Sequence, residues 1–474
     1  RGDSTGRQFT IHLEGYGRLG EALGKADGKP VFVHGGISGE TVLVEVIADR
    51  RTHTAARVLD VIERSPKRSL PSCPYVPLCT GCQWQHIDYD HQLELKRTFV
   101  MDALERVGGL KEVRVLETLG CPSPLGYRNH ARFTVGPASE SDGNPPPIIR
   151  SRKSRRRPPG PRSGRLGYVH RESRRHVEID ECLLMAPWIN HALRELQGLV
   201  HETTQLSLRY GINTGDWLLQ PTLQNPDVPL ESGQKSYRES LFGHEFQVSS
   251  PSFFQVNTVQ AERLGTLVIE ALELDGNETV VDAYAGVGTF AVLLSSVARK
   301  IIAVEESASA LVDARINVRG IDNIELRQAR TEDVLGEISR EGLDAVILDP
   351  PRSGCMPGTL EALIVEPPSK VVYVSCDPDS LARDLAVLVA GPFSLQWVCP
   401  VDMFPQTHHI ETVALLHRDP ARRLAQALGI PPTGASPVQV TPECLMRSDV
   451  VLPEGGQLHA WMLDPAVVLE TIVD

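Results

Sequence analysis

The sequence predicts an α/β fold, with an open and mostly parallel sheet in the C-terminal half and a small β-barrel at the N-terminus. Uninterrupted apolar runs are typical of parallel strands that are buried on both faces. Four predominantly apolar runs of this kind lie at residues 279–283, 301–304, 345–348 and 371–375, and within them a charged residue occurs only at Asp282. Residues 7–64 instead carry short alternating strands, divided by turns such as Gly35-Gly36. That pattern is typical of a small barrel.

The length of 474 residues predicts about two to four domains and a large buried core. We place the barrel at residues 1–65, a central α+β domain at 66–250, a catalytic domain at 251–418 and a C-terminal extension without an assigned role at 419–474. No run of about 18 apolar residues occurs, so we expect no membrane span. Nothing in the sequence predicts an obligate protein partner, and we expect a monomer.

The segment Thr279–Phe290 predicts a buried strand, a glycine turn and the start of a helix. Gly286 and Gly288 allow a ligand to approach the backbone closely. The next apolar strand ends in Glu305, where an acidic residue can accept hydrogen bonds from ribose hydroxyls. Asp333 follows a third short strand, where a contact with an adenine edge is expected. A nicotinamide-dependent dehydrogenase could share the first two features.

The fourth strand argues against a dehydrogenase and for a methyltransferase that uses S-adenosylmethionine. It continues into Asp349-Pro350-Pro351, and paired prolines hold a rigid turn that fixes the preceding carboxylate over the pocket. Methyltransferases that modify exocyclic amines usually follow such a turn with an aromatic residue that stacks on the base. Arg352 follows here, so methylation of an amino group is disfavoured.

Cys376 lies at the end of the apolar run 371–375, at a strand tip, where open α/β sheets place their chemistry. A thiolate that adds to C6 of uracil turns C5 into a nucleophile for a methyl sulfonium. Glu411, before a final apolar strand, is placed where a carboxylate could then remove the C5 proton. Alone, each residue would be better explained as a buried cysteine or a solvated carboxylate. Together they predict methylation of uracil C5.

Five stretches of the chain resemble, in the same order, the RNA uracil-C5 methyltransferases that use S-adenosylmethionine. They are Ser252–Asn257, Asp282–Phe290, Asp349–Gly354, Tyr373–Pro378 and His409–Glu411. The resemblance covers roughly residues 250 to 418. It implies that Cys376 is the nucleophile, that Glu411 removes the C5 proton, and that Asp349 contacts both the uracil edge and the cofactor.

The same resemblance implies a Rossmann-like S-adenosylmethionine-binding domain and a set of residues that contact the cofactor. These are Gln255, Asp282, Tyr284, Gly286, Gly288, Thr289, Glu305, Asp333 and Asp349. Thr289 departs from the pattern, because relatives often carry asparagine there.

Cys73, Cys79 and Cys82 form a second constellation, in a loop that also contains proline and glycine. Nine cysteines and no apolar signal segment point to a reducing, cytoplasmic compartment, where clustered cysteines usually bind metal or act in catalysis. Three thiolates need a fourth ligand, and Cys182 and Cys121 are the candidates. Zinc and a 4Fe-4S cluster both accept four cysteines, and the spacing alone favours zinc.

The resemblance reverses that preference. The run from Cys73 through Cys79 and Cys82 to His86 is similar to the iron–sulfur loop of the family's ribosomal-RNA members, whose fourth ligand lies far downstream, as Cys182 does. It implies a 4Fe-4S cluster as a second cofactor, with zinc as the alternative, and ribosomal RNA as the substrate. The other cysteines are expected to be loop or packing residues: Cys121, Cys355, Cys399 and Cys444.

The formal net charge of −12 alone argues against a nucleic-acid partner, but basic residues cluster in a predicted insertion at 139–165. They are Arg150, Arg152, Lys153, Arg155, Arg156, Arg157, Arg162 and Arg165. Such a stretch either contacts phosphates or is a solvated insertion without a role. The barrel resembles the TRAM domain of many RNA-modifying enzymes, and small barrels often bind single-stranded nucleic acid.

Methylation of uracil C5 in ribosomal RNA is therefore the function that the sequence predicts. The alternatives are the same chemistry on transfer RNA, methylation of cytosine C5, and a metal-containing RNA-binding protein without catalysis. The presence of Cys376, Glu411 and Asp349 weighs against the last of these.

Overall fold

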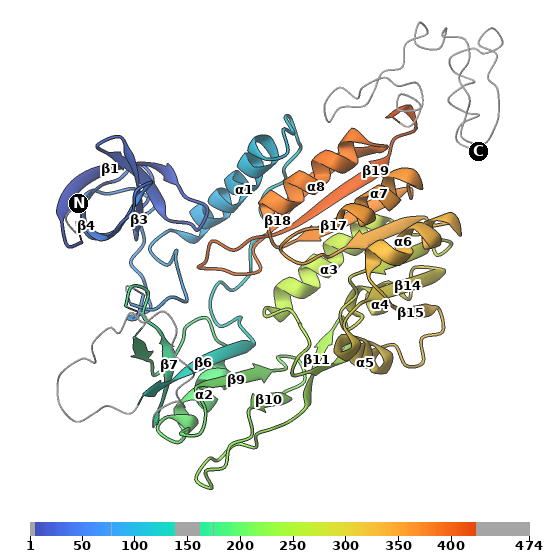
Figure 1. Ribbon diagram of the computed structural model, residues 1–474. Coiled ribbons are helices and arrows are strands. Elements are labelled where there is room, and N and C mark those ends of the chain that lie inside the picture. The colour runs from blue at the N-terminus through green and yellow to red at the C-terminus, as the bar shows by residue number, and fades with distance from the viewer. Residues whose placement is uncertain (1–4, 77, 138–161, 174, 423–474) are drawn as a thin grey trace, which may run out of the picture.

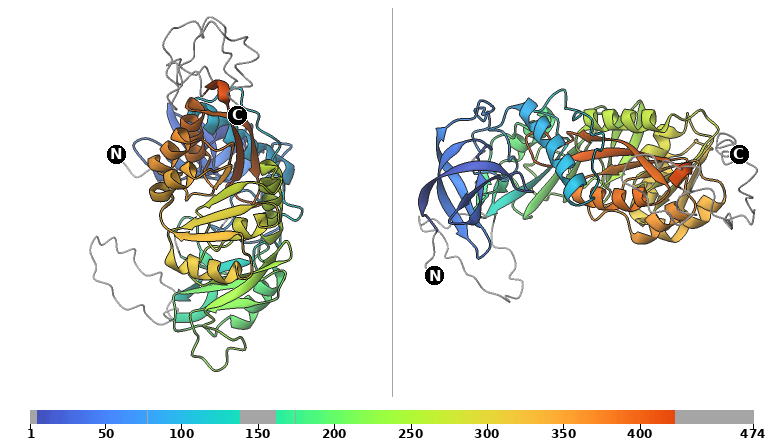
Figure 2. Two further views of the ribbon diagram at one scale, coloured as in Figure 1. Left: turned by 90° about the vertical axis from the view of Figure 1, so that its right-hand side faces the viewer. Right: turned by 90° about the horizontal axis from the view of Figure 1, so that it is seen from above.

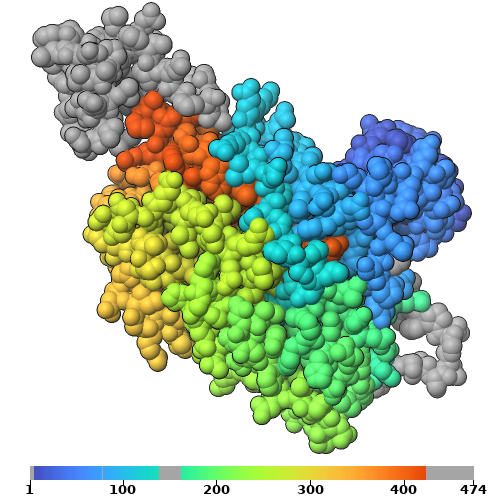
Figure 3. All heavy atoms as spheres, turned by 180° about the vertical axis from the view of Figure 1, so that it is seen from behind, coloured from blue at the N-terminus to red at the C-terminus, as the bar shows by residue number. Residues whose placement is uncertain are grey.

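The computed structural model describes residues 5–76, 78–137, 162–173 and 175–422. These residues form a barrel, a central five-stranded sheet and a larger seven-stranded sheet flanked by helices (Figure 1). Seen from above, the barrel and the seven-stranded sheet lie toward opposite ends of the molecule (Figure 2, right). From behind, the barrel projects from one corner of the molecule (Figure 3).

The N-terminal barrel is closed, with its strands in the order β1-β2-β3-β5-β4. Its strands are β1 (Gln8–Tyr16), β2 (Ala22–Ala26), β3 (Lys29–His34), β4 (Thr41–Asp49) and β5 (Thr54–Glu63). Leu13, Val33 and Val44 are fully buried inside it, because alternate residues of a strand face the same side. β2 was not predicted, since glycine and lysine interrupt its apolar pattern.

The central region contains a sheet in the order β10-β9-β6-β7-β8 and a separate hairpin of β11 and β12. The elements are β6 (His130–Pro137), β7 (Arg162–Val169), β8 (His176–Glu178), α2 (Pro187–Leu196), β9 (Gln205–Tyr210), β10 (Trp217–Gln220), β11 (Ser236–Leu241) and β12 (His244–Ser249). Helix α2 packs its buried face on this sheet, and its Ile189, Leu193 and Leu196 share one core with Phe133 of β6.

The predicted basic insertion is longer than the structure allows. Arg162 and Arg165 belong to β7, and Arg165 forms an ion pair with Glu178 at 3.3 Å. Residues 162–165, the last part of the predicted 139–165 insertion, therefore belong to a paired strand of the central sheet. The other six basic residues of the cluster lie outside the described residues, as does the C-terminal extension beyond residue 422.

The catalytic region forms a mixed sheet in the order β15-β14-β13-β16-β17-β19-β18. Its elements are α3 (Thr258–Leu272), β13 (Thr279–Ala283), α4 (Thr289–Leu294), β14 (Lys300–Glu305), α5 (Ala308–Asn317), β15 (Ile324–Gln328), α6 (Thr331–Arg340), β16 (Ala345–Leu348), α7 (Pro357–Val365), β17 (Lys370–Ser375), α8 (Pro378–Ala390), β18 (Phe393–Val401) and β19 (Glu411–Arg418). All four predicted apolar runs are strands, so the α/β fold class is confirmed.

Each face of this sheet has its own core. Val281 and Val304 pack with residues of α6, α7 and α8 on one face, whereas Val280 and Ile301 pack with α3 and α4 on the other. Burial on both faces explains why these runs are predominantly apolar. Strands β13 to β17 are parallel and β19 is antiparallel to β17. The start of β19 therefore lies at the same edge as the ends of the parallel strands.

Helix α1 (Tyr89–Arg106), which falls in the predicted central domain, packs against α8 of the catalytic region and lies between it and the barrel (Figure 1). Val100, Ala103 and Leu104 of α1 belong to the same core as α8. In the described part of the chain, no helix is long and apolar enough to cross a membrane.

Candidate active site and cysteine pocket

The predicted nucleophile and base are brought together by strand register. In the antiparallel pair of β17 and β19, Ser375 lies opposite Thr412. Cys376 follows Ser375, and Glu411 precedes Thr412 because the strands are antiparallel. Cys376 and Glu411 are therefore at neighbouring positions across the two strands. Strand β16 runs beside β17 in parallel and ends immediately before Asp349. Three chemically active side chains therefore leave three neighbouring strands at one edge of the sheet.

These side chains line a cavity of about 700 Å³. The cavity also contacts the glycine turn after β13 and the Asp349-Pro350-Pro351 turn after β16. The residues predicted for the site that line it are Gln255, Tyr284, Gly286, Thr289, Glu305, Asp349, Cys376 and Glu411. Residues from six separate segments thus meet in one site.

Burial disfavours ionisation throughout this cavity. It raises the pKa of Glu411 to about 8, and the nearby charge of Asp349 adds to the effect. Burial also raises the pKa of Asp349 to about 7. The pKa of the Cys376 thiol rises to about 11, through burial first and then through the charge of Glu411. Arg352 opposes the shifts of Cys376 and Glu411, because a positive charge favours the ionised forms.

The two glycines of the turn have different roles. Both adopt left-handed conformations, with φ of 56° at Gly286 and 86° at Gly288, which glycine reaches without strain. No described heavy atom lies within 4 Å of a Cβ added at Gly286, so its backbone is open to a ligand. Gly288 does not line the cavity; a Cβ there would lie 3.6 Å from that of Ala314 in α5. Gly288 therefore shapes the turn and the start of α4.

Two acidic residues hold the turn from opposite sides. Asp282 is fully buried, and its carboxylate accepts a hydrogen bond from the backbone N–H of Ala291 at 2.9 Å. Burial raises the pKa of Asp282 to about 8. Glu305 accepts from the N–H groups of Gly286 at 2.8 Å and Ser307 at 2.7 Å. Asp282 therefore stabilises the start of α4 without lining the cavity, whereas Glu305 stabilises the turn and also lines the cavity.

The cavity contains features that fit a nucleoside-containing ligand such as S-adenosylmethionine. The side-chain oxygen of Gln255 is buried and has no hydrogen-bond partner among the described residues. Tyr284 has a positive φ of 68°, which costs a non-glycine residue roughly 1–3 kcal/mol and is found mainly at functional sites. A free acceptor, the open backbone at Gly286 and a strained aromatic residue together suit close contact with such a ligand.

Asp333 is not part of this cavity. It lies in the first turn of α6 with its side chain exposed, whereas the preceding residue, Glu332, lines the cavity. Neighbouring helical positions point about 100° apart, so an offset of one residue turns the side chain away. Phe253 and Met356 also line the cavity and were missed by the sequence reasoning. The signal for Phe253 was an aromatic residue inside the stretch Ser252–Asn257.

A loop at residues 402–410 leads into Glu411 and is anchored from α1. The fully buried Lys96 donates to the carboxylate of Asp402 at 2.5 Å and to the carbonyl of His409 at 2.8 Å. The side chain of Gln92 bonds both the side chain and the backbone N–H of Gln406, at 3.0 Å each. The sequence reasoning missed Lys96, although it stands in the buried series of α1, four residues before Val100.

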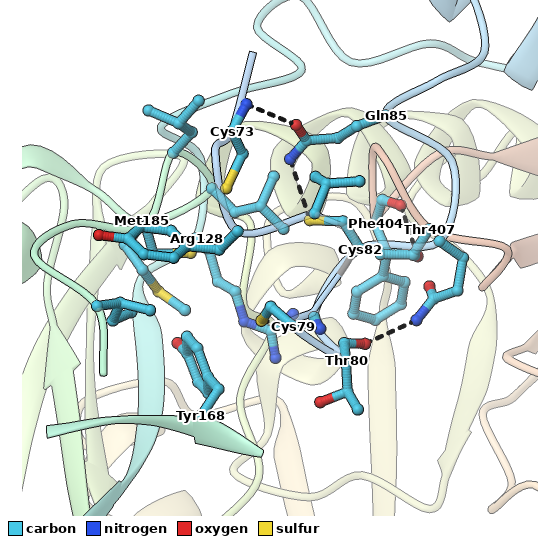
Figure 4. Close-up of a pocket in the computed structure, with 18 of the residues that line it drawn as sticks. Cys73, Cys79, Thr80, Cys82, Gln85, Arg128, Tyr168, Met185, Phe404 and Thr407 are labelled. Atoms are coloured by element: carbon cyan, nitrogen blue, oxygen red, sulfur yellow. Dashed lines mark hydrogen bonds between the residues drawn. The ribbon is translucent and has the colours of Figure 1, made fainter. Parts of the chain in front are cut away.

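The four predicted metal ligands line a second cavity, of about 360 Å³ (Figure 4). Cys182 joins Cys73, Cys79 and Cys82 there, although it lies far along the chain. The Gln85 amide connects two of them, since it accepts a hydrogen bond from the N–H of Cys73 and donates one to the sulfur of Cys82, both at 3.2 Å. The tertiary fold thus gathers the complete predicted cysteine set.

The cysteine cavity favours neutral thiols as it stands. Burial raises the pKa of Cys82 to about 12 and that of Cys182 to about 11, and the charges of the other cysteines add to both shifts. The hydroxyl of Tyr168 also lines the cavity and has no hydrogen-bond partner among the described residues. Within the described ranges, no three cysteine, histidine or carboxylate groups are close enough to hold a metal ion.

The described cysteines outside this cavity lie apart from it, as expected. The thiol of Cys121 donates to the carbonyl of Ser123 at 3.1 Å, and its N–H donates to the hydroxyl of Tyr89 at 2.7 Å. Cys355 and Cys399 are buried elsewhere in the chain. Cys444 lies outside the described residues.

The sheet order and the site define the class of this protein as an S-adenosylmethionine-dependent methyltransferase. A solved structure shows the same fold. The tRNA (uracil-54, C5)-methyltransferase of Pyrococcus abyssi, in complex with S-adenosyl-L-homocysteine, matches with a TM-score of 0.64 and 24% sequence identity, over 86% of this chain and 100% of that chain.

Sequence comparisons define the family. Residues 242–419 match the family profile described as tRNA (uracil-5-)-methyltransferase. An uncharacterized RNA methyltransferase of Gloeobacter violaceus is 32% identical over 467 residues, which is 87% of this chain and 97% of the relative. Another from Listeria innocua is 32% identical over 473 residues, 87% of this chain and 98% of the relative. The chain belongs to the RNA uracil-C5 methyltransferases and methylates uracil C5 in RNA with S-adenosylmethionine.

Proposed function

We propose that this enzyme methylates uridines of ribosomal RNA, with Cys376 as the nucleophile and Glu411 as the base. The observation that carries the proposed roles is their neighbouring position across the β17–β19 register, in one cavity with the glycine turn. C5 and C6 are bonded to each other in the uracil ring. Cys376 and Glu411, which are adjacent on neighbouring strands, can therefore act on these two atoms of one base.

The chemistry follows from this arrangement. The Cys376 thiolate adds to C6 of uracil, which makes C5 nucleophilic. S-adenosylmethionine, bound at the glycine turn, supplies a methyl group to C5 and leaves as S-adenosylhomocysteine. Glu411 then takes the proton from C5, and the electrons of that C–H bond restore the ring double bond as the bond between C6 and sulfur breaks. Cys376 returns as a thiolate, so the residue is regenerated.

Arg352 and the two carboxyl groups control when these steps can occur. A thiol with a pKa near 11 is almost entirely neutral at pH 7. The charge of Arg352 favours the thiolate, and the negative charges of Glu411 and Asp349 disfavour it. A Glu411 carboxyl with a pKa near 8 has to ionise before it can act as a base. Asp349, in its ionised form, can accept a hydrogen bond from N3–H of uracil. Unprotonated cytosine has no proton at N3, so this contact favours uracil.

For the second cavity we propose a 4Fe-4S cluster held by Cys73, Cys79, Cys82 and Cys182. Four thiols around one cavity supply a complete ligand set for such a cluster. Zinc, which accepts the same four cysteines with bonds of about 2.3 Å around one ion, is the alternative. A cluster holds its ligands farther apart. The unpaired hydroxyl of Tyr168 would then have sulfur acceptors nearby.

The preference for ribosomal RNA rests on the resemblance of the cysteine loop to the ribosomal-RNA members of the family. Transfer RNA is the second candidate, because the matching family profile and the Pyrococcus abyssi structure carry transfer-RNA names. The test is to quantify 5-methyluridine separately in purified ribosomal and transfer RNA from strains with and without the gene. Loss of the modification at a ribosomal position supports the proposal. Loss confined to transfer RNA would overturn it.

A further inference from the structure

Cys376 opens on a second large cavity besides the one that fits the cofactor. This barrel cleft, of about 1020 Å³, is lined by the barrel, by α1, by the start of α8 and by residues 408–410. Cys376 and Arg352 line both cavities. Its volume is at the upper end of the roughly 300–1,000 Å³ of small-ligand sites. If the methyl donor fills the cofactor cavity, the barrel cleft is the route by which an RNA strand can reach Cys376.

The barrel contributes aromatic side chains to this cleft. Phe32 and His53, which both line it, pack edge to face with ring centroids 5.6 Å apart. The Phe32 ring also lies against Gly17, where an added Cβ would come within 2.8 Å of it. The ring is therefore held in place on the barrel. A fixed aromatic ring beside a cleft is the platform on which proteins stack unpaired bases.

The cleft also contains two arginines that share the carboxylate of Asp379, and Arg106 is paired with Asp102 of α1 as well, at 2.9 Å. Asp379, near the start of α8, contacts Arg18 of the barrel at 2.5 Å and Arg106 of α1 at 3.1 Å. The side chains of Arg18 and Arg106 are 70% and 50% exposed. The Asp379 side chain is only 20% exposed, but the arginine ends of both pairs reach solvent, where ion pairs contribute little, so both arginines can exchange this carboxylate for an RNA phosphate.

From these contacts we infer that the barrel cleft binds the unpaired nucleotide next to the target uridine. Its base packs against Phe32 and His53, and its phosphate takes Arg18 and Arg106 from Asp379. The inference rests on the proposed role of Cys376, because that residue fixes where the target uracil lies. In this arrangement the barrel helps to select which uridine of the RNA is methylated.

Asp379 has a further consequence for selectivity. A carboxylate that occupies the arginines competes with any phosphate, so an RNA without a base to stack gains little by displacing it. The formal charge of −12 already disfavours non-specific RNA. Asp379 therefore discriminates against strands that offer only phosphates. Replacing it should increase affinity while decreasing selectivity.

The first experiment measures binding of a labelled single-stranded RNA fragment that carries the mapped target uridine, across a range of salt concentrations. Asp379→Asn should tighten binding about two- to fivefold, whereas Arg18→Ser should weaken it and reduce the salt slope by about 0.7. Arg51→Ser is the control, because Arg51 is exposed on the barrel and does not line the cleft. Weaker binding by Asp379→Asn, or equal effects of the two arginine variants, would overturn the proposal.

The second experiment tests the base contact by a double substitution in protein and RNA. The fragment carries 5-fluorouridine at the target, flanked either by its natural bases or by abasic riboses, and the readout is the rate of covalent adduct formation below saturation. In the wild type, loss of the flanking bases should slow the reaction about tenfold. In Phe32→Ala the rate should depend little on those bases. Leu59→Ala, an exposed barrel residue outside the cleft, should behave as the wild type.

The outcomes separate this proposal from the proposed function. If the wild type forms no adduct with the natural fragment, the role assigned to Cys376 fails, and with it the inference. If the adduct forms but Phe32→Ala retains the full dependence on flanking bases, the inference alone fails. Thermal unfolding of each variant, matched to the wild type, ensures that a slower reaction reflects the cleft. Should Phe32→Ala unfold early, Phe32→Leu removes the aromatic face and keeps the packing.

Discussion

The buried ammonium of Lys96 and the buried carboxylate of Asp402 form an ion pair at 2.5 Å between α1 and the loop that leads to Glu411. The two residues lie far apart in sequence. Lys96 also donates to the carbonyls of Phe404 and His409, and the Tyr89 hydroxyl donates to the second oxygen of Asp402. This network fixes the course of residues 402–410 and so the position of the base.

Lys96→Met should destabilise the protein strongly, because it leaves Asp402 buried without its cation. Removal of one partner of a buried pair costs about 3–5 kcal/mol. The measurement is urea unfolding, with Lys67→Met as the control, since Lys67 forms an exposed ion pair with Glu94 at 3.5 Å. The control should change stability by less than about 1 kcal/mol. Equal effects of the two substitutions would contradict the role given to the buried pair.

Cys376→Ala should abolish methyl transfer because no thiolate is left to add to C6. Binding of S-adenosylmethionine, measured by calorimetry, should remain close to that of the wild type, since the glycine turn and Gln255 are unchanged. The variant should also form no covalent adduct with RNA that contains 5-fluorouridine. Cys399→Ala is a control for loss of a buried thiol, because Cys399 lines none of the three cavities described above. Turnover by Cys376→Ala at the wild-type rate would exclude the proposed mechanism.

Glu411→Gln should allow addition and methyl transfer but block removal of the C5 proton. Methylated RNA should therefore accumulate on Cys376 as a protein–RNA band that survives denaturation. With the wild type, release of product should become faster as pH rises toward 8, because the pKa of Glu411 is raised to about 8 and only its ionised form is a base. If the variant releases free product at the normal rate, another group is the base.

Protein purified without oxygen should be brown and should contain iron and acid-labile sulfide. Serine substitution of Cys73, Cys79, Cys82 or Cys182 should each lower the iron content, whereas Cys121→Ser should leave it unchanged, because Cys121 does not line the cysteine cavity. If the protein is colourless and contains one equivalent of zinc, the four cysteines bind a zinc ion and the proposed cluster is wrong. Loss of metal in Cys121→Ser would mean that the fourth ligand is wrongly assigned.

Stability without ligands should fall as pH rises from about 6.5 to 8. Burial raises the pKa of Asp282 to about 8, of Asp349 to about 7 and of Glu411 to about 8. The unfolded carboxyls ionise near pH 4, so in this window the folded state binds more protons, and rising pH favours unfolding. Buried histidines with lowered pKa act in the opposite direction, but only below about 6.5.

Urea midpoints at pH 6.5 and 8 measure this effect. Asp282→Asn removes one of the titrating groups and keeps an acceptor for the Ala291 N–H, so its midpoint should depend less on pH. A midpoint that is constant or rises with pH in the wild type would contradict the direction of these shifts.

The sequence by itself determined the catalytic sheet and the chemistry at its edge. Apolar runs followed by glycine or proline turns specify buried strands and their ends, and strand ends of a parallel sheet meet at one edge. Cys376, Asp349 and the turn at Gly286 could therefore be placed together without a structure. Even the barrel followed from alternation alone, except for β2, whose pattern is interrupted by glycine and lysine.

Only the tertiary structure decided which side chains face the cavity and which distant segments meet. A helix turns by about 100° per residue, so sequence position could not show that Glu332 rather than Asp333 lines the cofactor cavity. Nor could it show that Lys96 reaches Asp402, that Cys182 meets Cys79, or that Cys376 opens on a second cavity at the barrel. These relationships depend on packing between elements far apart in the chain, which local sequence periodicity does not predict.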